Sequence, residues 1–119
     1  MTFYKHAVPI MAASIASTSV EAIEAEIKDV YNCLLQCHDC IDYPKPVPMR
    51  VWAAANKANY SWVQEYGRYL CNQWSLRNSG KRHKYEQLIW YTFGEPPKAL
   101  KEGPYKFTQP SIFFAKDNL

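Results

Sequence analysis

Glycine is scarce in this chain of 119 residues, which contains only four. Phosphate-cradling loops of the G-x-x-x-x-G-K type and the G-x-G-x-x-G dinucleotide fingerprint both need closely spaced glycines. Neither pattern is present, so the sequence excludes the conventional nucleotide-binding enzymes that use these loops. The hydrolase motifs H-E-x-x-H and G-x-S-x-G are also missing. No nucleophile with a matching base is therefore visible in the sequence.

Long apolar runs are missing as well. A membrane-spanning helix needs about 18 or more consecutive apolar residues, and no stretch approaches this length. The apolar stretch at 7–16 is short and is interrupted by Pro9, which makes it a poor secretory signal. We therefore expect a cytoplasmic protein without a membrane partner or disulfides, in which residues 1–17 form a packed arm or short helix.

The composition is that of a single globular domain spanning 1–119, with 48% apolar and 21% charged residues. Charge is divided unevenly along it. Residues 1–47 carry a net charge of −3, whereas residues 48–119 carry +6 and hold 14 of the 18 aromatic residues. This asymmetry suggests an electropositive, aromatic-rich face opposite an acidic one. Alternatively, the acidic and basic parts pack together or pair within an oligomer.

A regular apolar seam predicts a helix over 18–38. Thr18 is the expected N-cap, and Glu21 three residues later completes a capping box. Apolar residues then recur at spacings of 3 and 4, a heptad-like pattern. The seam suits core packing within one chain, and we also expect it to join copies into a homo-oligomer. Its members are Val20, Ile23, Ile27, Val30, Leu34 and Cys37.

Two further helices complete a mainly α fold class. Three prolines at 44–48 end the first helix. A second long helix is expected over Met49–Arg77, and a shorter third helix over Arg82–Phe93, ending at Gly94. The remainder, 95–119, is rich in proline. We expect a loop or extended segment there, with room for one or two strands around Ser111–Ala115.

Cysteines cluster in the string Cys33-Leu-Leu-Gln-Cys37-His38-Asp-Cys40. Zinc is the realistic metal for such a set, with the distant Cys71 as a further ligand. Radical enzymes that use C-x3-C-x2-C need a larger barrel than this chain builds. The alternative is that these residues are thiols of the core. We favour the alternative because paired C-x2-C motifs are absent, and we predict no metal or cofactor.

A dense basic cluster follows the second helix, with no acid between Glu65 and Glu86. Lys81 and Lys84 fall at the start of the predicted third helix, where free backbone N–H groups favour an anion. Arg68 and Asn72 on the second helix are placed to face the same region. The cluster predicts a phosphate-bearing partner, or alternatively a solvated turn. Its members are Arg77, Lys81, Arg82, His83 and Lys84.

Aromatic residues line the second helix beside this cluster. Such rings stack on a base or an arginine plane in nucleic-acid and nucleotide sites. A stripe of aromatics at helical spacing is more often core. The rings are Tyr60, Trp62, Tyr66, Tyr69 and Trp74.

Several short motifs resemble a group of small, mostly bacteriophage-encoded proteins. They are Pro48-x-x-x-Trp52, Asn59-Tyr60-x-Trp62, and Arg77 followed by Gly80-Lys81-x-His83-Lys84, and the similarity spans 48–110. The chain departs from the group at Gln73-Trp74, where the group has Glu-Tyr, and at Ser79, which looks inserted. The resemblance implies a phage context and marks residues rather than a reaction.

The leading hypothesis is a protein that binds a phosphate-bearing nucleotide or nucleotide-like ligand, and so sequesters a host defence signal in the host cytosol. One alternative is an oligomeric inhibitor of a host protein or nucleic acid. Another is a small nucleotide-processing enzyme that uses Glu65 and His83 as acid and base. The predicted binding residues are Asn59, Tyr60, Trp62, Arg68, Arg77, Lys81, His83 and Lys84.

Overall fold

The chain is mainly helical, as predicted, in a computed structural model that describes residues 8–38, 48–100 and 102. No strand occurs within these residues. The expected tail strands around 111–115 lie outside them, as does Cys40. The helices, in chain order, are α2 (Pro9–Ala16), α3 (Val20–Cys37), α4 (Pro48–Ala53), α5 (Lys57–Arg77) and the π-helix η1 (Leu88–Thr92).

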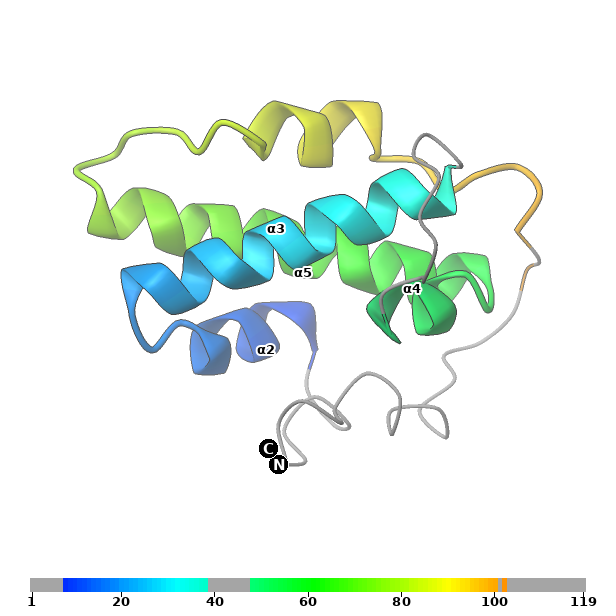
Figure 1. Ribbon diagram of the computed structural model, residues 1–119, viewed down its shortest axis with the longest axis horizontal. Coiled ribbons are helices and arrows are strands. Elements are labelled where there is room, and N and C mark those ends of the chain that lie inside the picture. Colours follow the sequence, from blue (N-terminus) through cyan, green and yellow to red (C-terminus); the bar gives the residue numbers. More distant parts are fainter. Residues whose placement is uncertain (1–7, 39–47, 101, 103–119) are drawn as a thin grey trace.

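The two long helices α3 and α5 lie side by side at the centre of the molecule (Figure 1). In this view α2 and α4 lie below the pair, and η1 lies above it. The apolar seam of α3 faces inward: Ile23, Ile27, Val30 and Leu34 are fully buried. These residues pack in the core of one chain. The expectation that they join two copies as a homo-oligomer is therefore not supported.

Aromatic side chains of α5 fill the other half of the core. Tyr60, Trp62 and Tyr66 are buried. The rings of Trp62 and Tyr66 stack with centroids 5.3 Å apart, and Trp52 of α4 meets Trp62 edge to face. Burial of rings of this size contributes a large share of the apolar area removed from water.

The first long helix begins one residue later than the predicted capping box requires. Ser19, not Thr18, is the N-cap, because its Oγ accepts a hydrogen bond from the Ala22 N–H at 3.0 Å. The Thr18 N–H donates instead to the carbonyl of Ala16 and closes the turn after α2. The short helix expected before this point is confirmed as α2.

The single helix predicted over 49–77 is two helices, so that prediction was wrong. Asn56 is the N-cap at which α5 begins as a new helix. Its side-chain oxygen accepts a hydrogen bond from the Asn59 N–H at 2.8 Å. The Asn59 side chain in turn donates to the carbonyl of Trp52 at 2.9 Å, near the end of α4. The pair holds a corner where the apolar stripe alone indicates a continuous helix.

The predicted third helix over 82–93 also begins later, since residues 81–83 are not helical and helix starts at Glu86. Two hydrogen bonds of His83 hold residues 83–86 in a turn, so the helix does not start earlier. The Nδ1 of His83 accepts from the Tyr85 N–H, and its carbonyl accepts from the Glu86 N–H. Residues 88–92 then adopt a π-helix, whose wider turn is marked by the Phe93 N–H donating to the Leu88 carbonyl.

Two polar side chains of α5 hold the π-helix in register. Gln64 donates to the carbonyl of Ile89 at 2.9 Å, and the Tyr60 hydroxyl donates to that of Phe93 at 2.6 Å. His38 Nε2 lies 2.7 Å from the same hydroxyl oxygen. Because the single hydroxyl proton is used on Phe93, His38 Nε2 must be the donor in that contact.

Gly67 marks the closest approach of α5 to its neighbours. A Cβ at this position would lie 2.6 Å from Val30 Cγ1 on α3 and 3.2 Å from Ile89 Cγ2 on η1. The absence of a side chain therefore lets α3, α5 and η1 pack together at one point.

We expect Gly67→Ala to destabilise the protein by about 1–3 kcal/mol, the usual result of overpacking a core, although alanine normally improves a helix. Urea unfolding followed by circular dichroism measures the change. Val30→Ala in the same chain makes room for the new methyl group, so the double variant should lose less stability than the two single losses together. A Gly67→Ala protein more stable than the wild type would contradict the close approach.

Candidate functional site

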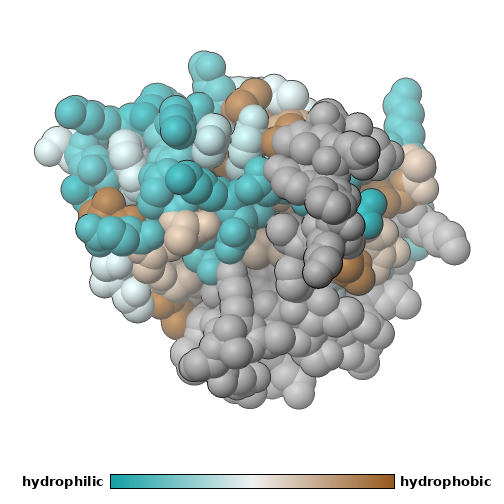
Figure 2. All heavy atoms as spheres, viewed as in Figure 1, coloured by the Kyte–Doolittle hydropathy of each residue, from teal (hydrophilic) through white to brown (hydrophobic). Residues whose placement is uncertain are grey.

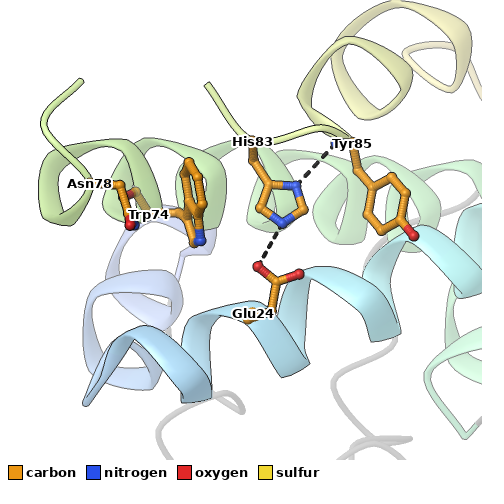
Figure 3. A network of polar contacts seen from close by, with 5 residues as sticks. All are labelled: Glu24, Trp74, Asn78, His83 and Tyr85. Atoms are coloured by element: carbon orange, nitrogen blue, oxygen red, sulfur yellow. Dashed lines mark hydrogen bonds and ion pairs between the residues drawn. The ribbon is translucent and has the colours of Figure 1, made fainter. Parts of the chain in front are cut away.

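His83 lies at the centre of a polar network between α3 and the connection formed by residues 78–85 (Figure 3). Its side chain is buried and points from this connection towards α3. Nε2 is 2.8 Å from Glu24 Oε2, and Nδ1 accepts a hydrogen bond from the Tyr85 N–H at 3.0 Å. Since Nδ1 is an acceptor, Nε2 carries the ring proton and donates it to the Glu24 carboxylate.

Aromatic rings enclose the imidazole on both sides. The ring of Trp74 on α5 packs edge to face against the imidazole, with the ring centroids 5.0 Å apart. The ring of Tyr85 is tilted against it, with centroids 5.4 Å apart. Tyr85 also stacks on Tyr31 of α3, with centroids 4.0 Å apart and an angle of 3° between the rings. His83 and Tyr85 thus anchor the 78–85 connection to α3.

The anchoring leaves the neighbouring cations at the surface. Lys81, Arg82 and Lys84 are all exposed, and Figure 2 shows hydrophilic residues gathered over the upper part of the molecule, where the connection runs in Figure 1. Arg82 pairs with the buried Glu86 at 2.6 Å, and the Lys84 ammonium lies 5.1 Å from the centre of the Tyr85 ring.

A surface groove of about 410 Å³ has Arg82 in its lining. We call it the 82–91 groove after its lining residues, Arg82, Glu86, Gln87, Trp90 and Tyr91. Tyr91 is 76% exposed. Trp90 is held by Arg68 of α5, whose guanidinium carbon lies 3.8 Å from the centre of the indole ring, a cation–π contact. The lining of the groove therefore combines one acid, one amide, one cation and two aromatic rings.

Besides His83, three of the predicted binding residues lie in the interior. Asn59 and Tyr60 are fully buried, Trp62 is 2% exposed, and the first two make the structural hydrogen bonds described above. Their rings and amides are not presented to solvent. In this fold these residues support the arrangement of the helices rather than line a surface for a ligand.

The fold directs Arg77 away from the other predicted basic residues. Arg77 reaches across to the turn after α2, where its guanidinium donates to the carbonyl of Ser17 at 3.0 Å and to Gln73 Oε1 at 2.6 Å. Lys81 and Lys84 do not lie at a helix N-terminus, because the connection is not helical at either residue. The argument for an anion site from free backbone N–H groups there was wrong.

The acid and base of the enzyme alternative are not brought together. Glu65 precedes Trp74, the α5 residue beside His83, by nine residues, which is about 14 Å along the helix axis. His83 is paired with Glu24 instead, and both of its nitrogens are engaged.

The three cysteines within the described residues are placed as thiols of the core. Cys33 and Cys71 are fully buried, and Cys37 is 8% exposed. Within residues 8–38, 48–100 and 102 no three metal-binding side chains converge. His38 contacts Tyr60, as described above. Burial raises the pKa of the Cys71 thiol to about 12, with smaller contributions from the carboxylates of Glu86 and Glu24. Burial, followed by the neighbouring Cys37 thiol, raises the pKa of Cys33.

Sequence reasoning missed the aromatic residues that line the groove. Trp90 and Tyr91 fall within the predicted third helix, and of the lining residues only Arg82 belongs to the predicted basic cluster. The available signal was the adjacent pair of large aromatics following Gln87 and the basic cluster. The pairing of His83 with Glu24 had no local signal, because 59 residues separate the two.

Comparison with protein-family models, with curated proteins and with solved structures found no match to this chain. The resemblance to phage-encoded proteins therefore stays a prediction. Among the described residues, every helix is too short or too polar to cross a membrane.

We expect Glu24→Ala to cost about 1–3 kcal/mol, the range for leaving a buried donor without its partner, because the His83 N–H loses its acceptor. Glu24→Gln retains an acceptor oxygen and should cost less. Nitrogen-15 NMR of the imidazole tests the geometry directly: the wild type should show the tautomer protonated at Nε2. A spectrum with the proton on Nδ1 would contradict the network.

The Cys71 thiol should resist modification in the folded protein, because the reactive thiolate is disfavoured by burial. Iodoacetamide at neutral pH, followed by peptide mass spectrometry, should label Cys71 only after unfolding. The same shift makes stability fall as pH rises from about 8.5, the ordinary thiol pKa, towards 12, and Cys71→Ala should reduce this loss. Rapid labelling of Cys71 in the native state would contradict the assignment.

Proposed function

We propose that this protein binds a phosphate-bearing nucleotide or nucleotide-like ligand at the 82–91 groove. The observation that carries the proposal is the contact of Arg68 with Trp90 beside exposed Tyr91, in a groove that Arg82 also lines. Aromatic faces stack on bases, and arginine and lysine bind phosphate. The site is thus moved from the interior residues Asn59, Tyr60 and Trp62 to the surface of η1 and the 78–85 connection.

The polar lining of the groove suits a nucleoside as well as a phosphate. The Glu86 carboxylate accepts hydrogen bonds from base amino or sugar hydroxyl groups, and the Gln87 amide both donates and accepts. Arg82 neutralises Glu86 at 2.6 Å, which lowers the repulsion between this carboxylate and an incoming phosphate. A volume of about 410 Å³ lies within the size range of small-molecule sites.

Two surface variants test the proposal with little risk to the fold. Lys81→Ala with Lys84→Ala removes two exposed cations, and Tyr91→Ala removes an exposed ring. Isothermal titration calorimetry with ATP, AMP and dTMP should show binding weakened by about fivefold or more in Tyr91→Ala, which loses a stacked ring. The loss of the two lysines, which do not line the groove, should weaken binding less. Lys28→Ala, an exposed lysine of α3, is the matched control and should bind as the wild type does.

Binding that survives both surface variants would place the ligand elsewhere on the protein. The absence of binding to every nucleotide and to oligonucleotides would overturn the proposal itself. Circular dichroism of each variant, compared with the wild type, separates loss of binding from loss of fold.

The biological role rests on the resemblance to phage-encoded proteins alone. On that basis we propose that nucleotide binding sequesters a signal of the host in its cytosol.

A further inference from the structure

Surface cations are also present outside the lining of the 82–91 groove. Arg82 lines the groove and shares its charge with Glu86, whereas Lys81 and Lys84 are exposed and do not line it. A single nucleotide in the groove would meet only Arg82 of these three. A ligand that engages all three cations needs phosphates that continue outside the groove.

The groove is also open enough for a ligand to continue over its edge. Two of its lining side chains are largely exposed, that of Arg82 by 82% and the residue Tyr91 by 76%. Sites for free small molecules usually bury most of the ligand surface. An open site at the protein surface instead leaves both ends of a bound chain in solvent.

The aromatic rings favour bases that are not paired. The centroids of Trp90 and Tyr91 lie 6.4 Å apart with 42° between their planes, so the two rings do not stack on each other. Bases within a duplex are stacked on each other, and their faces are not accessible to protein rings. Arg68 fixes the indole of Trp90 and adds positive charge at the same place.

Acidic residues of α3 limit the surface that favours phosphate groups. Glu21 and Glu24, together with a single lysine, Lys28, line a separate groove on α3, and Glu24 is the partner of His83. Phosphates are repelled on this side of the His83 network and attracted on the side of Lys81, Arg82 and Lys84. The binding surface is therefore a strip along the connection and η1.

We infer that the ligand of the 82–91 groove is a single-stranded nucleic acid. Its phosphates contact Lys81, Arg82 and Lys84, and its unpaired bases stack on Tyr91 and Trp90. The inference rests on the proposed function and narrows the class of its ligand from a nucleotide to a polynucleotide.

Fluorescence anisotropy with a labelled oligothymidylate of about 12 nucleotides tests this, a length within the site sizes of known single-strand-binding modules. The oligonucleotide should bind at least about tenfold more tightly than dTMP or a duplex of the same length, because only it offers several phosphates together with free bases. Tyr91→Ala should weaken oligonucleotide binding by about fivefold or more.

The salt dependence counts the phosphate contacts. Each phosphate neutralised on a single strand contributes about −0.7 to the slope of log K against log salt concentration. Three cations predict a slope of about −2, and Lys81→Ala with Lys84→Ala should reduce it to about −0.7. Lys28→Ala should leave the slope unchanged.

The outcomes separate the inference from the proposed function. If dTMP or ATP binds as tightly as the oligonucleotide, the protein binds nucleotides and the single-strand inference fails. If the duplex binds as tightly as the single strand, the inference fails because base faces are not being used. If neither mononucleotides nor oligonucleotides bind, both proposals fail.

Discussion

Two buried hydrogen bonds from α5 decide where the surface of η1 lies. Tyr60 and Gln64, one helical turn apart, donate to the carbonyls of Phe93 and Ile89. Loss of either bond would leave a polar group unpaired in the core, so the register of η1 on α5 is strongly favoured. Gly67 allows the close approach that these bonds need. The direction in which Trp90 and Tyr91 face follows from this register.

A second constraint decides where the charges lie. The hydrogen bond between His83 and Glu24 and the stacking of Tyr85 on Tyr31 hold these two side chains against α3. The residues on either side of His83 are then left at the surface, which places Arg82 beside the rings of η1 and Lys84 near the ring of Tyr85. A histidine that the sequence groups with a cationic cluster thus acts as an anchor, and the cations around it gain their exposure from its burial.

The fold was predictable where the pattern is local, and less so where distant residues compete. Periodicity from Ile23 to Leu34 predicted α3, and the core use of aromatics was weighed correctly as the more common outcome. The break before α5 was missed because the apolar stripe continues through it, although Asn56 is a good capping residue. Of the residues that line the groove, the predicted basic cluster contained only Arg82, and Lys81 and Lys84 do not line it. Glu24, distant in sequence, and the π-turn at Trp90 gave no comparable signal.

The geometry of the groove depends on the number of residues in the π-helix. Its hydrogen-bonded turn holds one residue more than an α-turn, and each residue of an ordinary helix rotates the next by about 100°. Removing one residue between 88 and 92 would return this segment to α-helical geometry, while Tyr60 and Gln64 still hold its two ends. The rings of Trp90 and Tyr91 would then face a different direction relative to Arg82. Deletion of a single codon would therefore be enough to change how these aromatic and cationic side chains are arranged relative to one another.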